Sequence, residues 1–164
     1  MNTIGRIILL VEAAAILERD LARREELGDD VRALLDQGRL IPATDYVNAQ
    51  RLRRSQQQEF AAIWADVDCL FTPTTPTSAP RLGSQTVMVG GTTKDLRPAT
   101  TSFTRAFNVL GLPALSMPCG LDSQGLPMGL QIVGKPFAEA TVLRVAAALE
   151  DAAGFSGEPS LHIG

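Results

Sequence analysis

The first third of the chain carries apolar residues at the spacing of amphipathic helices. In the opening stretch they lie mostly three or four positions apart, at Ile4, Ile7, Ile8, Val11, Ala14, Ala15 and Leu21. Such spacing gathers apolar side chains on one face, which predicts a first helix over residues 3–26, ending near Gly28. A second helix is predicted from Asp29 or Asp30 to Gly38, because either carboxylate can accept hydrogen bonds from the first free amides.

A third helix is predicted from Thr44, as its N-cap, to about Val67. Its apolar residues cluster at the two ends, and residues 53–59 between them are entirely polar. We expect this polar middle to be solvated, or to face something outside the chain.

The pattern changes at Cys69-Leu70-Phe71, a short apolar run that predicts a buried strand ended by Thr72-Pro73. More than half of residues 72–100 are Thr, Pro, Ser or Gly, which predicts a long irregular loop. A connection of this length inside a compact domain is usually functional or disordered. A brief strand is predicted within it over residues 87–89.

Two further apolar runs, residues 114–118 and 128–133, flank a turn-rich stretch and predict an antiparallel hairpin. A short helix over residues 102–110 should precede it and end at Gly111. A final helix is predicted over residues 138–153 with Gly154 as its C-cap, followed by a loose tail over residues 155–164.

This order of elements predicts an α/β fold with a mixed β-sheet covered by helices. A chain of 164 residues suits a single domain, residues 1–164. Hydrophobic residues make up 45% and charged residues 20%, which is typical of a folded protein.

Composition and charge exclude several classes of function. A net charge of -3 gives no general attraction to nucleic acid or anionic membranes. The basic cluster Arg51, Arg53 and Arg54 is interpreted as a solvated helix face, with accessory RNA binding as the weaker alternative. The apolar N-terminal run is too short and too charged to span a bilayer. Two cysteines without close spacing indicate reduced thiols in a cytoplasmic protein. The single histidine, His162, offers no metal site.

The candidate nucleophiles lack the groups that would activate them. Ser116 lies within a predicted strand, not on a G-x-S-x-G turn, and Cys119 follows Pro118 with no histidine to lower its pKa. Lys94 and Lys135 could replace histidine as a base, but neither lies in a serine- and glycine-rich setting. The stretch Gly90–Lys94 lacks the spacing of a phosphate-binding loop. We therefore interpret Ser116 and Cys119 as strand residues of a hairpin.

Several fragments together resemble the C-terminal part of amidase signature enzymes. They are Ile41-Pro-Ala-Thr-Asp-Tyr46, Ala49-Gln-Arg51, Asp68-Cys-Leu-Phe-Thr-Pro-Thr-Thr-Pro76, Asn108-Val-Leu-Gly-Leu-Pro113, Pro118-Cys-Gly120, Gly125-Leu-Pro-Met-Gly-Leu-Gln-Ile-Val-Gly134 and Glu139-Ala-Thr141. Each is weak alone, but they follow one another in order over nearly the whole chain. The resemblance implies a partial α/β/α sandwich and hydrolysis or transfer of carboxamides by a Ser-cisSer-Lys triad, with no metal or organic cofactor.

The glycine- and serine-rich signature that carries that triad is absent from this sequence, and so is a counterpart of its lysine. No catalytic residue can therefore be assigned. The chain is interpreted as the C-terminal segment of an amidase-type hydrolase, inactive alone. The alternative is a noncatalytic module derived from an amidase that self-associates or docks on a partner. The expected partners are a second copy or a missing N-terminal half, with a small amide substrate only in the completed enzyme.

The resemblance also assigns roles to individual positions. Substrate-pocket walls are expected at Thr74, Phe103 and Arg105. Scaffold positions are expected at Asn108, Gly111, Pro113, Gly120, Gly129 and Gly134, where glycine permits turns or close approach of the backbone. The segment Thr100–Ala106 contains no acid, where amidotransferase A subunits hold an aspartate for glutamine. This favours a general amidase over the glutamine-specific type.

Overall fold

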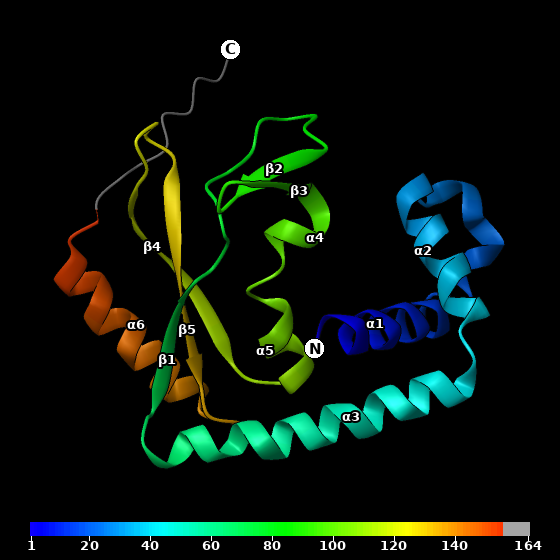
Figure 1. Ribbon diagram of the computed structural model, residues 1–164, viewed down its shortest axis with the longest axis horizontal. Coiled ribbons are helices and arrows are strands. Elements are labelled where there is room, and N and C mark those ends of the chain that lie inside the picture. Colours follow the sequence, from blue (N-terminus) through cyan, green and yellow to red (C-terminus); the bar gives the residue numbers. More distant parts are fainter. Residues whose placement is uncertain (156–164) are drawn as a thin grey trace. The chain divides into compact units, whose positions relative to one another are not determined.

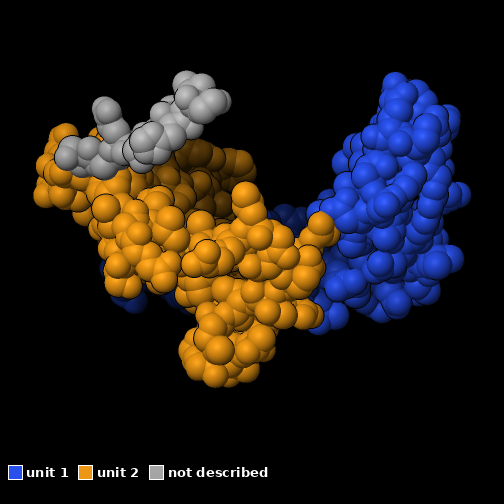
Figure 2. All heavy atoms as spheres, turned by 90° about the horizontal axis from the view of Figure 1, so that it is seen from above, with its two compact units in different colours: residues 1–66, 108–110 blue, residues 67–107, 111–164 orange. Residues whose placement is uncertain are grey.

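The computed structural model describes residues 1–155, so the predicted loose tail lies, but for Phe155, outside the described residues. Contacts divide the chain into two compact units (Figure 2): unit 1 holds residues 1–66 and 108–110, and unit 2 holds residues 67–107 and those from 111 onward. The expectation of one domain over residues 1–164 stays a prediction. None of the helices in residues 1–155 is long and apolar enough to cross a bilayer.

Unit 1 is helical, and its first helix is shorter than predicted (Figure 1). Helix α1 spans Asn2–Ile16, and a 3-10 helix, η1, follows over Asp20–Glu26, with non-helical dihedral angles at Arg23. The distribution of apolar residues explains why the α-helix ends at Ile16. Charged residues dominate from Glu18 to Glu26, so little apolar surface remains to hold a continuous helix against a neighbour.

Helix α2 spans Asp29–Leu40 and continues through Gly38, where the sequence predicted its end. The N-cap is Gly28, and no side chain caps the helix, so the expectation that Asp29 or Asp30 would cap it was wrong. Both carboxylates lie in the first turn, where Asp30 accepts a hydrogen bond from the Val31 amide at 2.9 Å. A Cβ atom at Gly38 would overlap the carbonyl group of Leu10 in α1. Gly38 is therefore the residue that lets α1 and α2 approach closely, and not a helix terminator.

Helix α3 spans Ala43–Ala61 and is followed by a short 3-10 helix, η2 (Ala62–Ala65). Its polar middle contacts another part of this chain. Arg53 Nε donates to the carbonyl oxygen of Val109 at 2.6 Å, and Gln57 Nε2 donates to that of Leu110 at 2.8 Å. These carbonyls end helix α5 (Arg105–Leu110), where no intrahelical donor remains for them. At these two positions the expectation of solvent or an outside partner was therefore wrong.

Unit 2 is built on a three-stranded antiparallel sheet in the order β1-β5-β4. Strand β1 spans Cys69–Pro73, β4 spans Ala114–Leu121 and β5 spans Pro127–Gly134. The strand at Cys69 and the hairpin are confirmed, with a bulge between Pro118 and Gly120. The predicted class, helices covering a sheet, is confirmed. All pairings among the described strands are antiparallel, so the parallel pairs of a mixed sheet do not occur in residues 1–155.

The core of unit 2 lies between this sheet and helix α6 (Glu139–Ala153). Alternate strand residues point to the helix and form a buried cluster of Met117, Ile132, Val142 and Ala146. The helix ends at Gly154 in the left-handed conformation, as predicted. The face of the sheet opposite α6 carries Ser116 and Gln131, which are partners in the register of β4 and β5.

The stretch expected to be a long irregular loop contains regular structure. Strand β2 (Thr86–Val89) includes the predicted brief strand, and it pairs with β3 (Thr92–Asp95). A short helix, α4, follows over Leu96–Thr100. Strand β3 is exposed throughout and polar, so periodicity gave no signal for it.

Candidate functional site

The side of the sheet away from α6 forms a polar row across three strands. Residues Thr72, Gln131 and Ser116 are register partners on β1, β5 and β4. The Gln131 side chain is buried, at 3% exposure, and its Nε2 donates to Thr72 Oγ1 at 2.9 Å and to the Phe103 carbonyl oxygen at 3.4 Å. A buried amide needs such partners, so this residue ties the loop at Phe103 to the sheet.

Two hydroxyl groups meet one step further along the strands. Thr74 Oγ1 and Ser116 Oγ lie 2.6 Å apart, and either can be the donor. Gly129 lies between them on β5: a Cβ atom there would be 2.9 Å from Thr74 Oγ1 and 3.0 Å from Ser116 Oγ. Glycine at this position therefore leaves the space in which the two hydroxyls meet.

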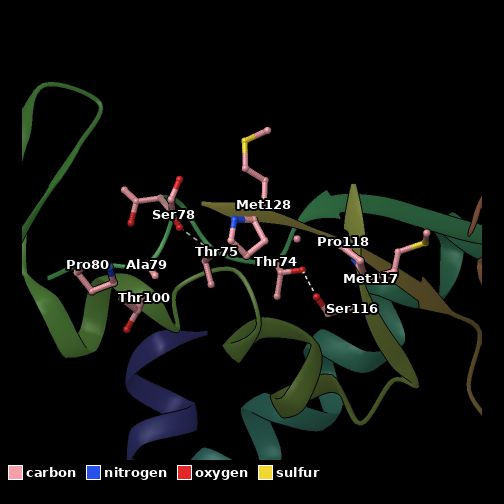
Figure 3. Close-up of a pocket in the computed structure, with 13 residues that line it drawn as sticks. Thr74, Thr75, Ser78, Ala79, Pro80, Thr100, Ser116, Met117, Pro118 and Met128 are labelled. Carbon is pink, nitrogen blue, oxygen red and sulfur yellow. Dashed lines mark hydrogen bonds between the residues drawn. The ribbon is translucent and has the colours of Figure 1, made fainter. Parts of the chain in front are cut away.

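This hydroxyl pair opens into a cavity of about 410 Å³ (Figure 3). Six hydroxyl-bearing residues line it: Thr74, Thr75, Thr77, Ser78, Thr100 and Ser116. The rest of the lining is apolar or glycine and comes from Ala79, Pro80, Met117, Pro118, Pro127, Met128 and Gly129. The Met117 side chain itself packs in the core against α6. None of these described residues carries a charge. The cavity is therefore an uncharged site with many hydroxyl groups in its lining.

The loop that supplies most of these hydroxyls is held by local hydrogen bonds. Thr75 Oγ1 donates to the Thr77 carbonyl oxygen at 2.7 Å. Thr77 Oγ1 is buried and has no hydrogen-bond partner in the described part of the chain. A buried hydroxyl without a partner is uncommon in folded proteins.

Asp122 fixes the same loop from the turn between β4 and β5. Its Oδ1 accepts hydrogen bonds from the amides of Gln124 at 2.8 Å and Leu126 at 2.9 Å. A hydrogen bond from the Ser78 side chain, helped by the turn amides, holds the pKa of Asp122 below its ordinary value. The ionised form of Asp122 therefore links the hairpin turn to the wall of the cavity.

The three predicted wall residues are not brought together. Thr74 lines the cavity, whereas Phe103 and Arg105 do not. Phe103 is 40% exposed and contacts the sheet through its backbone carbonyl group. Arg105 begins α5 and donates to the carbonyl oxygen of Pro98 at 3.5 Å and to Thr101 Oγ1. Their role as pocket walls stays a prediction.

The six predicted scaffold positions lie at element boundaries or contacts. Gly129 lines the cavity. A Cβ atom at Gly134 would lie 2.5 Å from Val142 Cγ2 and 3.6 Å from Pro113 Cγ, so this glycine permits the packing of α6 on the sheet. Gly120 adjoins the bulge in β4. Asn108 lies in α5, and Gly111 follows that helix with φ 71°.

Sequence reasoning missed most of the cavity. It dismissed Ser116 as a strand residue, and it did not single out Thr77, Ser78, Thr100 or Met128. The available signal was the composition of residues 72–80, in which Thr, Ser and Pro alternate closely. That signal predicted a functional loop but not which hydroxyls converge, because convergence depends on the β1–β5–β4 register.

The candidate nucleophiles have no base beside them in the described structure. The hydrogen bond of Ser116 joins it to another hydroxyl, that of Thr74. Cys119 is exposed, with Sγ 3.5 Å from the Met128 carbonyl oxygen. The Lys135 ammonium group lies 3.0 Å from Asp68 Oδ1. Burial raises the pKa of the Cys69 thiol, which disfavours the thiolate. No group of three or more His, Cys, Asp or Glu residues within residues 1–155 could hold a metal ion.

Comparisons with known proteins identify relatives of most of the chain. The family model described as Amidase matches residues 8–143. A fatty acid amide hydrolase of Medicago truncatula is 44% identical over 131 residues, which are 80% of this chain and 22% of that protein. An amidase of Pseudomonas putida is 41% identical over 147 residues, 88% of this chain and 31% of that enzyme. A solved amidase structure superposes with a TM-score of 0.85 at 31% identity, over 92% of this chain and 35% of the other.

Proposed function

This chain belongs to the amidase family, and from that premise we propose that it forms the C-terminal segment of an amidase-type hydrolase, inactive alone. The chain spans between a fifth and a third of the length of the curated relatives given above. In the completed enzyme, this segment would supply the scaffold and one wall of the substrate site. The residues that break the carboxamide C–N bond would lie in sequence outside it.

The chemistry of the cavity supports a role in substrate binding, with the catalytic residues lying outside this segment. A hydroxyl nucleophile needs an adjacent base to take its proton, as well as donors that stabilise the oxyanion. The Thr74–Ser116 pair contains two hydroxyls and no base. The hydrogen bonds described for Ser116 and Thr74 therefore suit binding better than proton transfer. This is the observation that carries the proposal.

The sheet gives a second line of support. Strands β1 and β4 are the edges of the three-stranded sheet, and β4 is eight residues long. Natural proteins rarely leave an edge of this length uncovered, because its unpaired backbone groups invite pairing with other strands. A larger sheet continued by the rest of an amidase chain would satisfy these groups.

A chimera tests the proposal directly. The segment of the Pseudomonas putida amidase that aligns with this chain would be replaced by residues 1–155, and hydrolysis of that enzyme's own amide would be measured. We expect activity from the chimera, none from the host enzyme lacking the segment, and none from the purified chain with benzamide or acetamide. Turnover by the chain alone that Ser116→Ala abolishes would refute the proposal, and so would a folded but inactive chimera.

The alternative function, a noncatalytic module that self-associates or docks on a partner, uses the same open edges. Phe71 on edge strand β1 is 52% exposed, which favours some covering surface. Light scattering on the purified chain separates the two ideas. A stable dimer that persists at low micromolar concentration would favour the module, whereas a monomer that gains activity only within the chimera favours the hydrolase segment.

A further inference from the structure

Strand β1 leaves one side of its backbone open at the edge of the sheet (Figure 1). We propose that this edge accepts an added β-strand, and that in the isolated chain the added strand is β1 of a second copy. The two β1 strands run antiparallel about a two-fold axis at Phe71, which joins two three-stranded sheets into one six-stranded sheet. This inference concerns the chain by itself and goes beyond the proposed function.

The hydrogen bonds to β5 determine which backbone groups of β1 point outward. The Thr74 amide donates to the Gly129 carbonyl oxygen at 2.8 Å, and the pairing of β1 with β5 has no register shift. Residues of an antiparallel strand alternate between facing the neighbouring strand and facing away from it. Thr72 and Leu70 therefore bond to β5. The residues whose backbone groups face the open edge are Cys69, Phe71 and Pro73.

These outward groups are free to bind another strand. Among residues 1–155, no hydrogen bond joins the Cys69 or Phe71 backbone to a group outside the sheet. Unpaired amides and carbonyls at an edge are a template for a further strand. Pro73 has no amide hydrogen, but its carbonyl oxygen can still accept a bond.

The opposite edge of the sheet is less suited to pairing. Strand β4 contains Pro118 in its interior and a bulge between Pro118 and Gly120. The proline removes a donor from the middle of that strand, and a bulge bends and twists an edge away from a partner. In β1 the proline is the last residue and the pairing is regular.

The donors and acceptors of β1 match a second copy of the same strand. With the axis at Phe71, the two Phe71 residues exchange both of their backbone hydrogen bonds. Each Cys69 lies opposite Pro73 of the other copy, so its amide donates to that carbonyl oxygen. No residue of β1 is charged, and Asp68 lies opposite Thr74 of the second copy. The pairing therefore brings no like charges together.

The Phe71 side chain adds apolar contact to this pairing. Phe71 is the register partner of Ile132, which lies in the cluster beneath α6, so both side chains are on the α6 side of the sheet. Helix α6 packs mainly on β4 and β5, and Phe71 remains 52% exposed. In the proposed pair the two rings lie next to each other across the axis, where each covers part of the other.

The size of the contact limits its strength. Two hydrogen bonds from Phe71, two from Cys69 and one aromatic pair make an interface smaller than the roughly 800 Å² per partner of stable complexes. We therefore expect a dimer that forms above about 100 µM and dissociates at low micromolar concentration. At low concentration the edge is free, so the dimer does not conflict with the proposed function.

Disulfide trapping tests the register. Pro73→Cys combined with Cys119→Ser leaves the introduced thiol and Cys69 as the two thiols of the chain. Within one strand these positions are about 13 Å apart, too far for a disulfide. Across the proposed pair their Cα atoms are about 5.5 Å apart, which suits one.

We expect oxidation at about 200 µM to give mainly disulfide-linked dimers of this variant, about tenfold more than in a matched control. The control is Leu121→Cys with Cys119→Ser, because Leu121 is as exposed as Phe71, at 52%, but lies on β4. Equal cross-linking of the two variants would overturn the proposal.

Hydrogen exchange and light scattering test the pairing without a cross-link. Raising the concentration of the unmodified chain from low micromolar to about 200 µM should slow exchange of the Phe71 amide several-fold and leave that of Ser116, on the edge of β4, unchanged. Phe71→Lys should abolish the dimer, because it places two like charges at the axis. Leu121→Lys is the matched control and should dimerise normally. A chain that stays monomeric, a dimer that survives Phe71→Lys, or one that Leu121→Lys removes would each contradict the proposal.

These outcomes are separate from those of the chimera. An active chimera together with a chain that stays monomeric at about 200 µM would sustain the hydrolase segment and remove the pairing of β1. A folded but inactive chimera together with selective cross-linking of the Pro73→Cys variant would do the reverse.

Discussion

The two units of this chain are held together in different ways, and only unit 2 holds the candidate site. Unit 1 relies on close helix contact at Gly38, a small buried cluster of Ile4, Ala49 and Val109, and side-chain hydrogen bonds between helices. Unit 2 packs a sheet against α6, and its central strand β5 contains the fully buried Ile132 and Val133. The hydroxyls of the cavity are therefore placed partly by strand register, which fixes side-chain positions more tightly than a loop can.

Unit 1 also has large apolar side chains at its surface. Leu40 is 84% exposed and Ile16 is 76% exposed, both at helix ends. Its ion pairs, such as Arg23 with Asp20 and Glu26, are exposed to solvent, and exposed pairs add little to the free energy of unfolding. Unit 2 also exposes large apolar side chains, Leu82 and Phe137 among them, so surface exposure does not distinguish the units. The difference lies in their cores: unit 1 depends on a few helix contacts, whereas unit 2 packs a sheet on a helix.

The largest expected effect comes from opening the core of unit 2. Ile132→Ala should lower the free energy of unfolding of unit 2 by about 3 to 4 kcal/mol, because a fully buried side chain leaves a cavity that strands cannot close. Hydrogen exchange of β5 amides would measure the loss. Fluorescence of the single tryptophan, Trp64, reports unit 1, and its denaturation midpoint should stay unchanged.

Leu35→Ala is the counterpart in unit 1, since Leu35 is 1% exposed. It should move the Trp64 transition and leave exchange in β5 unaltered. If both variants shift both signals equally, the two units unfold together and the comparison between them fails.

The next prediction concerns the close contact between α1 and α2, which lies within unit 1. Gly38→Ala should destabilise unit 1 by about 2 to 3 kcal/mol, because the new methyl group meets the Leu10 backbone, which cannot rotate away. Urea denaturation followed by Trp64 fluorescence measures this loss. Arg39→Ala, at the exposed neighbouring position, is the control and should change stability by less than about 0.5 kcal/mol. Equal stability of the two variants would show that α1 and α2 are not in close contact.

A smaller effect tests how α3 holds the end of α5. Arg53→Met keeps the apolar stem of the side chain but removes the guanidinium group that donates to the Val109 carbonyl oxygen. We expect a loss of about 1 to 2 kcal/mol in unit 1, since a buried acceptor loses its partner. Arg54→Met, at the adjacent exposed position, is the matched control. An equal effect at both positions, measured by the same Trp64 transition, would mean that the hydrogen bond adds nothing.

These contacts also show what periodicity could and could not predict. The hairpin and α6 were predictable because apolar residues such as Ile132 and Val142 recur at strand and helix spacing. The C-terminal end of α1 was not predictable. Apolar residues become sparse in the charged segment after Ile16, and only packing decides where the helix ends. Gly38 looked like a helix end, although it is a contact residue. No local pattern distinguishes the two roles.

The site was predictable only in part, for a related reason. Thr74 was identified through its resemblance to family members, and the Thr-rich loop through its composition. The meeting of Thr74 with Ser116 depends on pairing between strands 42 residues apart in the chain. A single sequence does not specify such a register in advance. Strand β3 gave no signal for another reason, since its exposed, polar residues show no apolar alternation.

The smallest expected effect compares one carboxylate in each unit. The hydrogen bond from Arg24 lowers the pKa of Asp36 in unit 1, and the bond from Ser78 lowers that of Asp122 in unit 2. Because each folded pKa lies below its unfolded value, each carboxylate stabilises its unit at neutral pH. That contribution is lost as the pH falls through the folded pKa. Both groups are exposed, so the change should be small.

Hydrogen exchange between pH 7 and pH 3 would follow this loss in both units. Asp122→Asn should flatten the pH dependence at the β4–β5 turn and leave α2 unchanged, and Asp36→Asn should do the opposite. If Asp122→Asn alters the pH dependence of α2 as well, the carboxylates do not act on separate units. If it leaves the turn unchanged, the Ser78–Asp122 bond does not hold the cavity wall, and Ser78 is fixed only by its own loop.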